Sequence, residues 1–141
     1  MLSKASNQVY ISGALTMFDR KDWYEAVGKV VDSLGYYAYV PHLHIDSKKN
    51  VTSKEIYETD MRELEKSFLV IADVSCPSLG VGAELERSNA KHIPVVLMYE
   101  KDHIASDFVQ GMPAVIKEIA YPEKEYALRE LKRFLREYFP L

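Results

Sequence analysis

The segment from Pro77 to Glu84 combines residue types that could bind an anion and carry out acid–base chemistry. Its sequence is Pro-Ser-Leu-Gly-Val-Gly-Ala-Glu, and it leads into a predicted helix. Free N–H groups and the helix dipole favour an anion at such a start, and Ser78 adds a hydroxyl. Glu84 lies about one turn into the helix, so its carboxylate can point back toward the same place. The alternative is an ordinary helix entry with a capping serine, turn glycines and an acidic residue that suits the dipole. The spacing alone favours neither interpretation.

Two common phosphate-binding motifs do not occur in the sequence. Gly80-Val81-Gly82 lacks the third glycine of the dinucleotide fingerprint, and it follows the third predicted strand instead of the first. There is also no Walker-type Gly-Lys-Ser or Gly-Lys-Thr. An anion at this loop would therefore have to be bound in another way.

Several other residues could do chemistry, but each also has an ordinary structural explanation. Asp60 lies among solvated charges on a predicted helix, and this pattern alone predicts a surface residue. Tyr10 lies in a predicted central strand, where a core aromatic is the usual occupant. His42 and His44 lack a third ligand at suitable spacing, so no metal site is predicted. Cys76 is the single cysteine, which excludes an intramolecular disulfide and favours an ordinary thiol.

Hydrophobic periodicity divides the chain into alternating strands and helices. Apolar spacings of three and four predict helices over residues 19–34, 53–66, 81–91 and 123–138. Apolar and β-branched runs predict strands over 8–12, 37–40, 68–72, 94–99 and 115–120. We expect Asp19 to cap the first helix and Gly35 to end it. Residues 42–50 are a predicted loop, and 100–113 form a polar connection with room for one further helix.

This order predicts an α/β fold. We expect a doubly wound, three-layer sandwich of the flavodoxin or Rossmann type, with a mostly parallel sheet of about five strands. The 141 residues are about the length of one domain, so residues 1–141 are expected to form a single domain. Such sheets bind ligands at the carboxyl ends of their strands, where the strand order reverses. Ser12 and Gly13, at the end of the first strand, are therefore candidate substrate contacts.

Composition and charge exclude several classes of function. A net charge of −3 and a pI near 5.8 argue against a protein that binds nucleic acid polymers through a basic face. The longest apolar runs have five or six residues, which is too few to span a membrane. The first residues lack the apolar stretch of a secretory signal, so a cytoplasmic location is expected. We also expect no cofactor.

Three parts of the sequence share their pattern with one family. They are Val9-Tyr10-Ile11-Ser12-Gly13, Ile56-Tyr57-Glu58-Thr59-Asp60, and Ala72-Asp73-Val74 followed by Pro77 to Leu85. Together they resemble the nucleoside 2-deoxyribosyltransferase superfamily, and most closely its 2′-deoxynucleoside 5′-monophosphate N-hydrolase branch. The resemblance covers residues 8 to 112, and its most specific part is the run from Pro77 to Leu85. The doubly wound sheet of that family agrees with the fold predicted above.

The resemblance implies a mechanism with a glycosyl-enzyme intermediate. Glu84 matches the nucleophile, which attacks C1′ of the sugar and expels the base. Asp60 matches the carboxyl group that moves protons to and from the base or water. Tyr10 matches a tyrosine whose hydroxyl orients the nucleophile. Paired carboxyl groups suit this chemistry, because one stabilises or traps an oxocarbenium-like sugar while the other transfers protons.

The resemblance also implies how the substrate is bound. Ser78 and Gly80 match the loop that holds the 5′-phosphate. Ser106 resembles a serine that reaches the phosphate in the neighbouring subunit's site, which implies a homodimer with composite sites. In the hydrolases a Gly-Ser-Ile-Arg-Gly-Gly loop follows the first strand, whereas residues 13–18 here are Gly-Ala-Leu-Thr-Met-Phe. Arg20 is expected to supply the charge that this loop lacks.

Three functions remain open at this point. The first is an N-glycosidase that hydrolyses the base–sugar bond of (deoxy)nucleoside 5′-monophosphates. The second is a transferase that exchanges bases on deoxyribose, and the third is a non-catalytic nucleotide-binding module. All three imply a nucleotide or nucleoside as the small-molecule partner. The sequence leaves open the base, the choice between ribose and deoxyribose, and the need for a 5′-phosphate.

Overall fold

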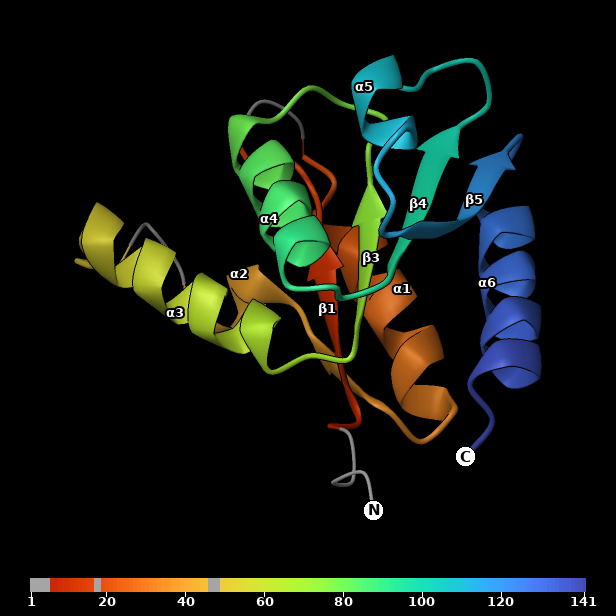
Figure 1. The fold of residues 1–141 in the computed structure, drawn as a ribbon, viewed down its shortest axis with the longest axis horizontal. Helices are drawn as coiled ribbons and strands as arrows, with labels where there is room; N and C mark the ends of the chain where they lie inside the picture. The colour runs from red at the N-terminus through yellow and green to blue at the C-terminus, as the bar shows by residue number, and fades with distance from the viewer. Residues whose placement is uncertain (1–5, 17–18, 46–48) are drawn as a thin grey trace.

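The computed structural model describes residues 6–16, 19–45 and 49–141. In this part of the chain five strands form one parallel sheet in the order β2-β1-β3-β4-β5 (Figure 1). The strands are β1 (Gln8–Ser12), β2 (Tyr37–Tyr39), β3 (Leu69–Asp73), β4 (Val95–Glu100) and β5 (Val115–Tyr121). The predicted doubly wound α/β fold is confirmed.

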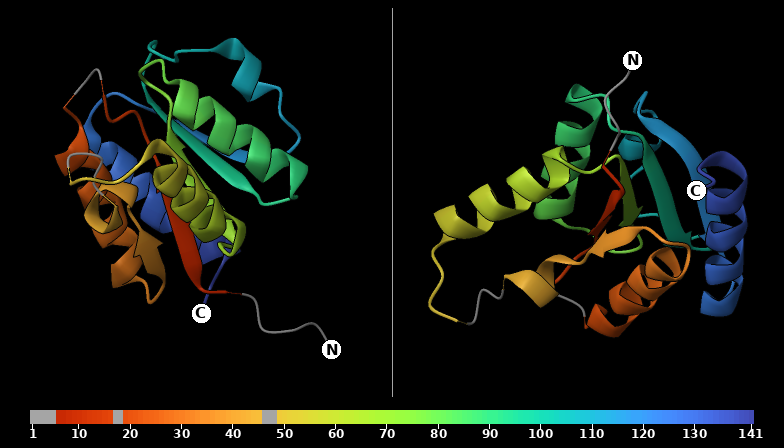
Figure 2. Two further views of the ribbon diagram at one scale, coloured as in Figure 1. Left: turned by 90° about the vertical axis from the view of Figure 1, so that its left-hand side faces the viewer. Right: turned by 90° about the horizontal axis from the view of Figure 1, so that it is seen from below.

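Helices cover both faces of the sheet (Figure 2). They are α1 (Lys21–Ser33), α2 (Pro41–His44), α3 (Ser53–Glu65), α4 (Leu79–Ala90), α5 (Asp107–Gln110) and α6 (Lys124–Tyr138). Helices α1 and α6 pack on one face, and α3 and α4 pack on the other, so that each face has its own apolar cluster. None of the described helices is long and apolar enough to cross a membrane.

The middle of the sheet is buried along its whole length. Every residue of β1 and β3 is buried, because helices cover both of their faces. Side chains alternate between the two faces, so that Val9 and Ile11 join the cluster under α1 and α6. Tyr10 points to the opposite face and joins the cluster under α3 and α4. The sequence pattern of β1 thus decides which side chains can reach α4.

Helix boundaries follow the predicted capping signals with one correction. Thr52 and Glu55 form a capping box at the start of α3, and Gly35 has a φ of 95° just after α1. The prediction that Asp19 caps α1 is wrong, because Arg20 occupies the N-cap position and no side chain caps this helix. The Arg20 carbonyl accepts the first helical bonds, from the N–H groups of Trp23 and Tyr24.

The polar connections contain two short helices. The loop predicted over residues 42–50 is wrong at its start, because Pro41–His44 form α2 with the proline in its first turn. Proline lacks an N–H and fits that position without losing a hydrogen bond. The connection between β4 and β5 contains α5, as the sequence allowed. Met17 and Phe18 of the first loop lie outside the described residues.

Candidate active site

A cavity of about 1130 Å³ opens at the carboxyl ends of the strands, on the side of α3 and α4. The strand order reverses between β1 and β3, so the segment after β1 leads to α1 on one face and the segment after β3 leads to α4 on the other. Such diverging segments leave a crevice that binds ligands in doubly wound folds. Six of the eight predicted site residues line this cavity: Gly13, Asp60, Ser78, Gly80, Glu84 and Ser106.

The other two predicted residues, Tyr10 and Ser12, hold the Glu84 carboxylate. The Tyr10 hydroxyl donates a short hydrogen bond to Oε2, and the Ser12 hydroxyl donates to Oε1 at 2.7 Å. The two side chains are two residues apart on β1 and therefore point to the same face of the sheet. Both are buried, and Glu84 lies in the first turns of α4 with its carboxylate aimed back at the sheet. The predicted approach of Glu84 to the sheet edge is therefore confirmed.

Burial dominates the electrostatics of this carboxyl group. It raises the pKa of Glu84 to about 7, although the hydrogen bonds from Tyr10 and Ser12 act in the opposite direction. Desolvation, reinforced by the neighbouring Glu84 and Asp60 carboxyl groups, raises the pKa of Tyr10 far above its ordinary value. Tyr10 therefore keeps its proton and acts as a hydrogen-bond donor.

Asp60 brings a second carboxyl group to the same cavity. Considered alone in the sequence it looked like a surface residue, and this interpretation is wrong. It is half-buried in α3, one turn after Ile56, which also lines the cavity. Burial raises the pKa of Asp60 to about 6, while the Tyr39 hydroxyl acts to lower it. Its Oδ1 atom is buried without a hydrogen-bond partner among the described residues.

The start of α4 leaves open space beside the cavity. Ser78 caps the helix by accepting a hydrogen bond from the Val81 N–H at 3.2 Å. A Cβ at Gly80 would lie 3.9 Å from the Ser78 hydroxyl, and one at Gly82 would meet no atom within 4 Å. No packing inside the described chain therefore requires these glycines. They let a ligand approach the free N–H groups of the first helical turn.

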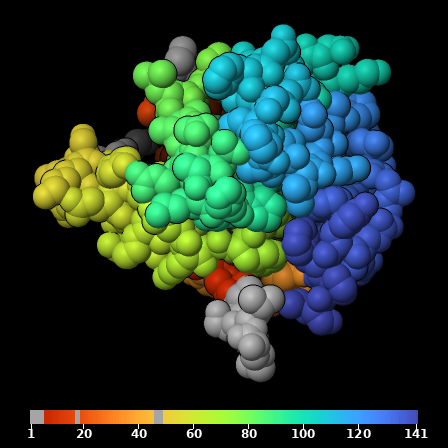
Figure 3. Space-filling view, in the orientation of Figure 1, coloured from red at the N-terminus to blue at the C-terminus, as the bar shows by residue number. Residues whose placement is uncertain are grey.

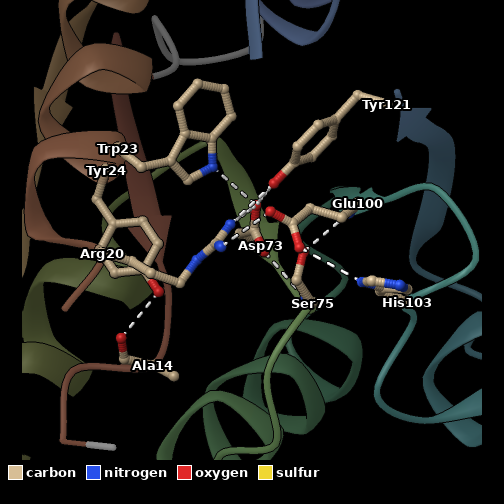
Figure 4. A network of polar contacts seen from close by, with 9 residues as sticks. All are labelled: Ala14, Arg20, Trp23, Tyr24, Asp73, Ser75, Glu100, His103 and Tyr121. Carbon is tan, nitrogen blue, oxygen red and sulfur yellow. Dashed lines mark hydrogen bonds and ion pairs between the residues drawn. The ribbon is translucent and has the colours of Figure 1, made fainter. Parts of the chain in front are cut away.

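Arg20 does not supply a charge to the cavity, contrary to our expectation. Its guanidinium pairs with Asp73 at 3.2 Å and donates to the Tyr121 hydroxyl at 2.9 Å, as Figure 4 shows. Asp73 also accepts from Trp23 Nε1 at 2.8 Å and from the Tyr121 hydroxyl at 2.6 Å. This network ties the start of α1 to the ends of β3 and β5. Among the described residues that line the cavity, Lys21 is the single lysine or arginine, and no sequence signal pointed to it.

The loop after β1 is fixed by Tyr24. Its hydroxyl donates to the Ala14 carbonyl at 2.8 Å (Figure 4), and its ring lies against Gly13. A Cβ at Gly13 would lie 2.2 Å from the ring, so no other residue fits there without movement. The described start of this loop is thus held in place beside the cavity, with Gly13, Leu15 and Thr16 among the lining residues.

His42, considered from the sequence only as a possible metal ligand, lines the cavity as well. Its Nε2 lies 2.8 Å from a Glu25 carboxylate oxygen, and its side chain is 9% exposed. Its Nδ1 is buried and has no partner in the described part of the chain. His44 does not converge with it, because the His44 ring stacks on Tyr39. No cluster that could hold a metal ion occurs among the described residues.

Ser106 stands at the N-cap position of α5 and lines the cavity of its own chain. Two large apolar side chains beside it face solvent: Leu79 is 97% exposed and Phe108 is 84% exposed. They extend from α4 and α5, which lie next to each other on the face shown in Figure 3. Whether Ser106 also reaches a neighbouring subunit stays a prediction.

Comparison with known proteins gives one consistent result. A family model described as nucleoside 2-deoxyribosyltransferase matches residues 9–119. A protein of Methanosarcina mazei named "Putative 2'-deoxynucleoside 5'-phosphate N-hydrolase 1" is 39% identical over 99 residues, which cover 70% of this chain and 60% of that protein. A protein of the same name from Methanosarcina barkeri is 33% identical over 147 residues, which cover 96% of this chain and 86% of that protein.

A solved structure shares the fold. The CMP N-glycosidase of Clostridium botulinum matches with a TM-score of 0.72 at 17% identity, over 91% of this chain and 99% of its own. The family match runs from Val9 to Ile119, within β5, and includes all eight predicted site residues. The chain belongs to the nucleoside 2-deoxyribosyltransferase family.

Proposed function

We propose that this protein is an N-glycosidase that hydrolyses the base–sugar bond of (deoxy)nucleoside 5′-monophosphates. The observation that carries the proposal is the Glu84 carboxylate, held by Tyr10 and Ser12 at a cavity of about 1130 Å³ that contains a second carboxyl group, Asp60. Relatives named as deoxynucleoside 5′-phosphate N-hydrolases support the same reaction class.

The first half of the reaction would form a covalent intermediate. An oxygen of the ionised Glu84 attacks C1′ of the sugar, and the C1′–N bond breaks as the base leaves. Protonated Asp60 gives its proton to the departing base. This step leaves a glycosyl ester on Glu84, a neutral base and an ionised Asp60.

The second half would restore the enzyme. Asp60 takes a proton from a water molecule, whose oxygen attacks C1′ and releases Glu84 as a carboxylate. The products are the base and the sugar 5-phosphate. Because the pKa of Glu84 is raised to about 7 and that of Asp60 to about 6, the pair holds one proton between these pH values, mostly on Glu84. The reactive arrangement, with the proton on Asp60 and Glu84 ionised, is the less populated of the two. We therefore expect a bell-shaped pH profile with its maximum between pH 6 and 7.

The start of α4 would anchor the 5′-phosphate. The first residues of α4 line the cavity together with Ser78, and Lys21 lines it too, so a phosphate here would meet free helix N–H groups and a positive charge. Binding the phosphate at a distance from the reacting bond would place C1′ against Glu84. Lys21 would take the role that we had first expected for Arg20.

The test is a chromatographic assay for released base. Ribo- and deoxyribonucleoside 5′-monophosphates and the matching nucleosides are each incubated with the protein and with the Glu84→Gln variant. We expect the native protein to release base from the monophosphates and the Glu84→Gln variant to release none. Full turnover by Glu84→Gln would refute the role of Glu84, and release from nucleosides alone would refute the phosphate site.

A deoxyribosyltransferase is the second candidate. The matching family model carries that name, and a cavity of about 1130 Å³ is slightly larger than usual ligand sites, so an acceptor base has room beside the sugar. Adding a second free base to the assay separates the two reactions. A new nucleoside or nucleotide indicates transfer, whereas a sugar phosphate as the sole sugar product indicates hydrolysis. A nucleotide-binding module would show a thermal shift with nucleotide and no released base.

We also infer a homodimer in which Ser106 serves the neighbouring site. The exposed side chains of Leu79 and Phe108 at the cavity mouth support it, because large apolar groups of this kind pack in interfaces. Mixing the Glu84→Gln and Ser106→Ala variants tests the idea. If each is impaired alone, a mixed dimer contains one site with both native residues and regains part of the activity. No recovery after subunit exchange would contradict a composite site.

A further inference from the structure

Tyr39 is a buried residue that touches the site but has no role in the reaction described above. It ends β2, and 2% of its surface is exposed. Its ring stacks on the Tyr10 ring, with centroids 5.5 Å apart and planes inclined by 25°. It also stacks on the His44 ring at 4.4 Å and 14°. These contacts hold the ring in one position, so the direction of its hydroxyl is fixed.

The Tyr39 hydroxyl is buried without a hydrogen-bond partner among the described residues. Asp60 Oδ1, on α3, is also buried without a hydrogen-bond partner in the described chain. Both groups lie on the α3 and α4 side of the sheet: Tyr39 packs in the same cluster as Met61, the residue after Asp60 on α3, and each group acts on the pKa of the other. A buried polar atom without a partner lowers stability, so two of them in this part of the fold call for an explanation.

We propose that Tyr39 is a positioning residue whose hydroxyl forms a hydrogen bond with Asp60 during the reaction. The proposal rests on the function proposed above, in which Asp60 must be protonated in one half-reaction and ionised in the other. A tyrosine hydroxyl can accept a hydrogen bond from the acid and donate one to the carboxylate. Rotation about the C–O bond of Tyr39 therefore lets the same hydroxyl form a hydrogen bond with either protonation state of Asp60.

The proton balance of the reaction is unchanged by this contact. Burial and the Asp60 carboxyl group raise the pKa of Tyr39 well above its ordinary value, so Tyr39 keeps its own proton throughout. Its hydroxyl stabilises the carboxylate that remains after Asp60 has protonated the base. When water gives a proton to Asp60, the hydroxyl turns back to act as an acceptor.

Other ionisable groups surround this pair and contribute to its titration. Those that act on Tyr39 or Asp60, or stack on Tyr39, come from β1, β2, α2, α3 and α4. They are Tyr10, Tyr37, His44, Arg62, Glu63 and Glu84. Because the Tyr39→Phe variant keeps all of them and removes one oxygen atom, a change in its pH profile reports the hydroxyl alone.

Tyr36 provides a matched control. Its hydroxyl is also buried without a partner in the described chain, but its ring packs against Phe68 in the cluster under α1 and α6. The Tyr36→Phe variant therefore removes the same atom from the opposite face of the sheet. Any general effect of deleting a buried hydroxyl appears in both variants.

The experiment compares the pH dependence of base release in the native protein and both variants. One hydrogen bond to a charged group corresponds to a change of about one pKa unit. The optimum lies midway between the pKa values of Asp60 and Glu84. In Tyr39→Phe the pKa of Asp60 rises, so we expect the optimum to move up by about half a pH unit while KM stays unchanged.

A second measurement does not depend on activity. Carbon-13 NMR titration of the Asp60 carboxyl group should give a higher pKa in Tyr39→Phe than in the native protein, and no change in Tyr36→Phe. An unchanged Asp60 titration in Tyr39→Phe would overturn the proposal even if the protein released no base. If the native protein released no base but the NMR shift appeared, the proposed function would fail and the Tyr39–Asp60 contact would stand.

Discussion

Replacing Glu84 by glutamine should stabilise the folded protein at high pH while it removes activity. Burial raises the pKa of Glu84 to about 7 in the folded chain, compared with 4.5 for an exposed glutamate. As the pH rises, the unfolded chain therefore loses this proton first. The stability that the protonated group contributes is fully present below pH 4.5 and is lost as the pH rises through about 7.

The size of the effect follows from the difference between the two pKa values. A difference of about 2.5 corresponds to about 3 kcal/mol, with 1.36 kcal/mol for each pKa unit. This is an upper limit, because the carboxylate faces a cavity that admits water. Glutamine has the same shape, never ionises, and can still pair with Tyr10 and Ser12. At pH 8 we expect Glu84→Gln to be about 1–3 kcal/mol more stable than the native protein.

Urea unfolding between pH 4 and pH 8 measures this difference. The two proteins should have nearly equal free energies of unfolding at pH 4. The difference should grow across the pH range in which Glu84 ionises. Glu86→Gln is the matched control, since Glu86 is exposed two residues along the same helix. A difference in free energy of unfolding that stays constant with pH, or that also appears in Glu86→Gln, would refute the conclusion that burial of the ionised Glu84 costs stability.

Four further substitutions test the site and the elements that position it. Asp60→Asn should lower the rate of base release at least about 100-fold in the chromatographic assay, because it removes the proton donor. Gly13→Ala should lower the free energy of unfolding in urea by about 1–3 kcal/mol, since the new methyl would lie 2.2 Å from the Tyr24 ring. Gly82→Ala, with no atom within 4 Å, should keep or raise stability by up to about 1 kcal/mol. Ser78→Ala should cost about 1 kcal/mol of stability through loss of the cap, and calorimetry should show that it weakens binding of a monophosphate more than binding of the matching nucleoside.

The fold could be predicted because its signals are local. The apolar run from Phe68 to Ala72 has no alternation, and a strand buried on both faces needs that pattern. The capping box at Thr52 and the glycine after α1 mark helix ends within a few residues. The start of α1 could not be predicted in the same way. It depends on the pairing of Arg20 with Asp73, which lies 53 positions away in the sequence.

The site was only partly predictable, because its geometry depends on contacts between distant elements. Glu84 and Ser78 follow from the helix start, and local spacing places them correctly. Asp60 looked solvated because its neighbours along α3 are charged, whereas the cavity on its other side is formed by α4 and the loop after β1. Tyr10 is a core aromatic, as its strand position suggested, yet its hydroxyl also reaches Glu84. The family resemblance supplied what local pattern could not.

Three of the five buried side-chain atoms that lack a partner in the described chain lie at or next to the cavity. Two of them belong to His42 and Asp60, which line it, and the third belongs to Tyr39, which stacks on Tyr10. The other two are the Tyr36 hydroxyl, in the cluster under α1 and α6, and Arg20 Nε at the start of α1. Such atoms lower stability, so packing alone would not favour them. Those at the cavity lie in the part of the fold that holds the two carboxyl groups with raised pKa values, where a functional site keeps polar groups at some cost in stability.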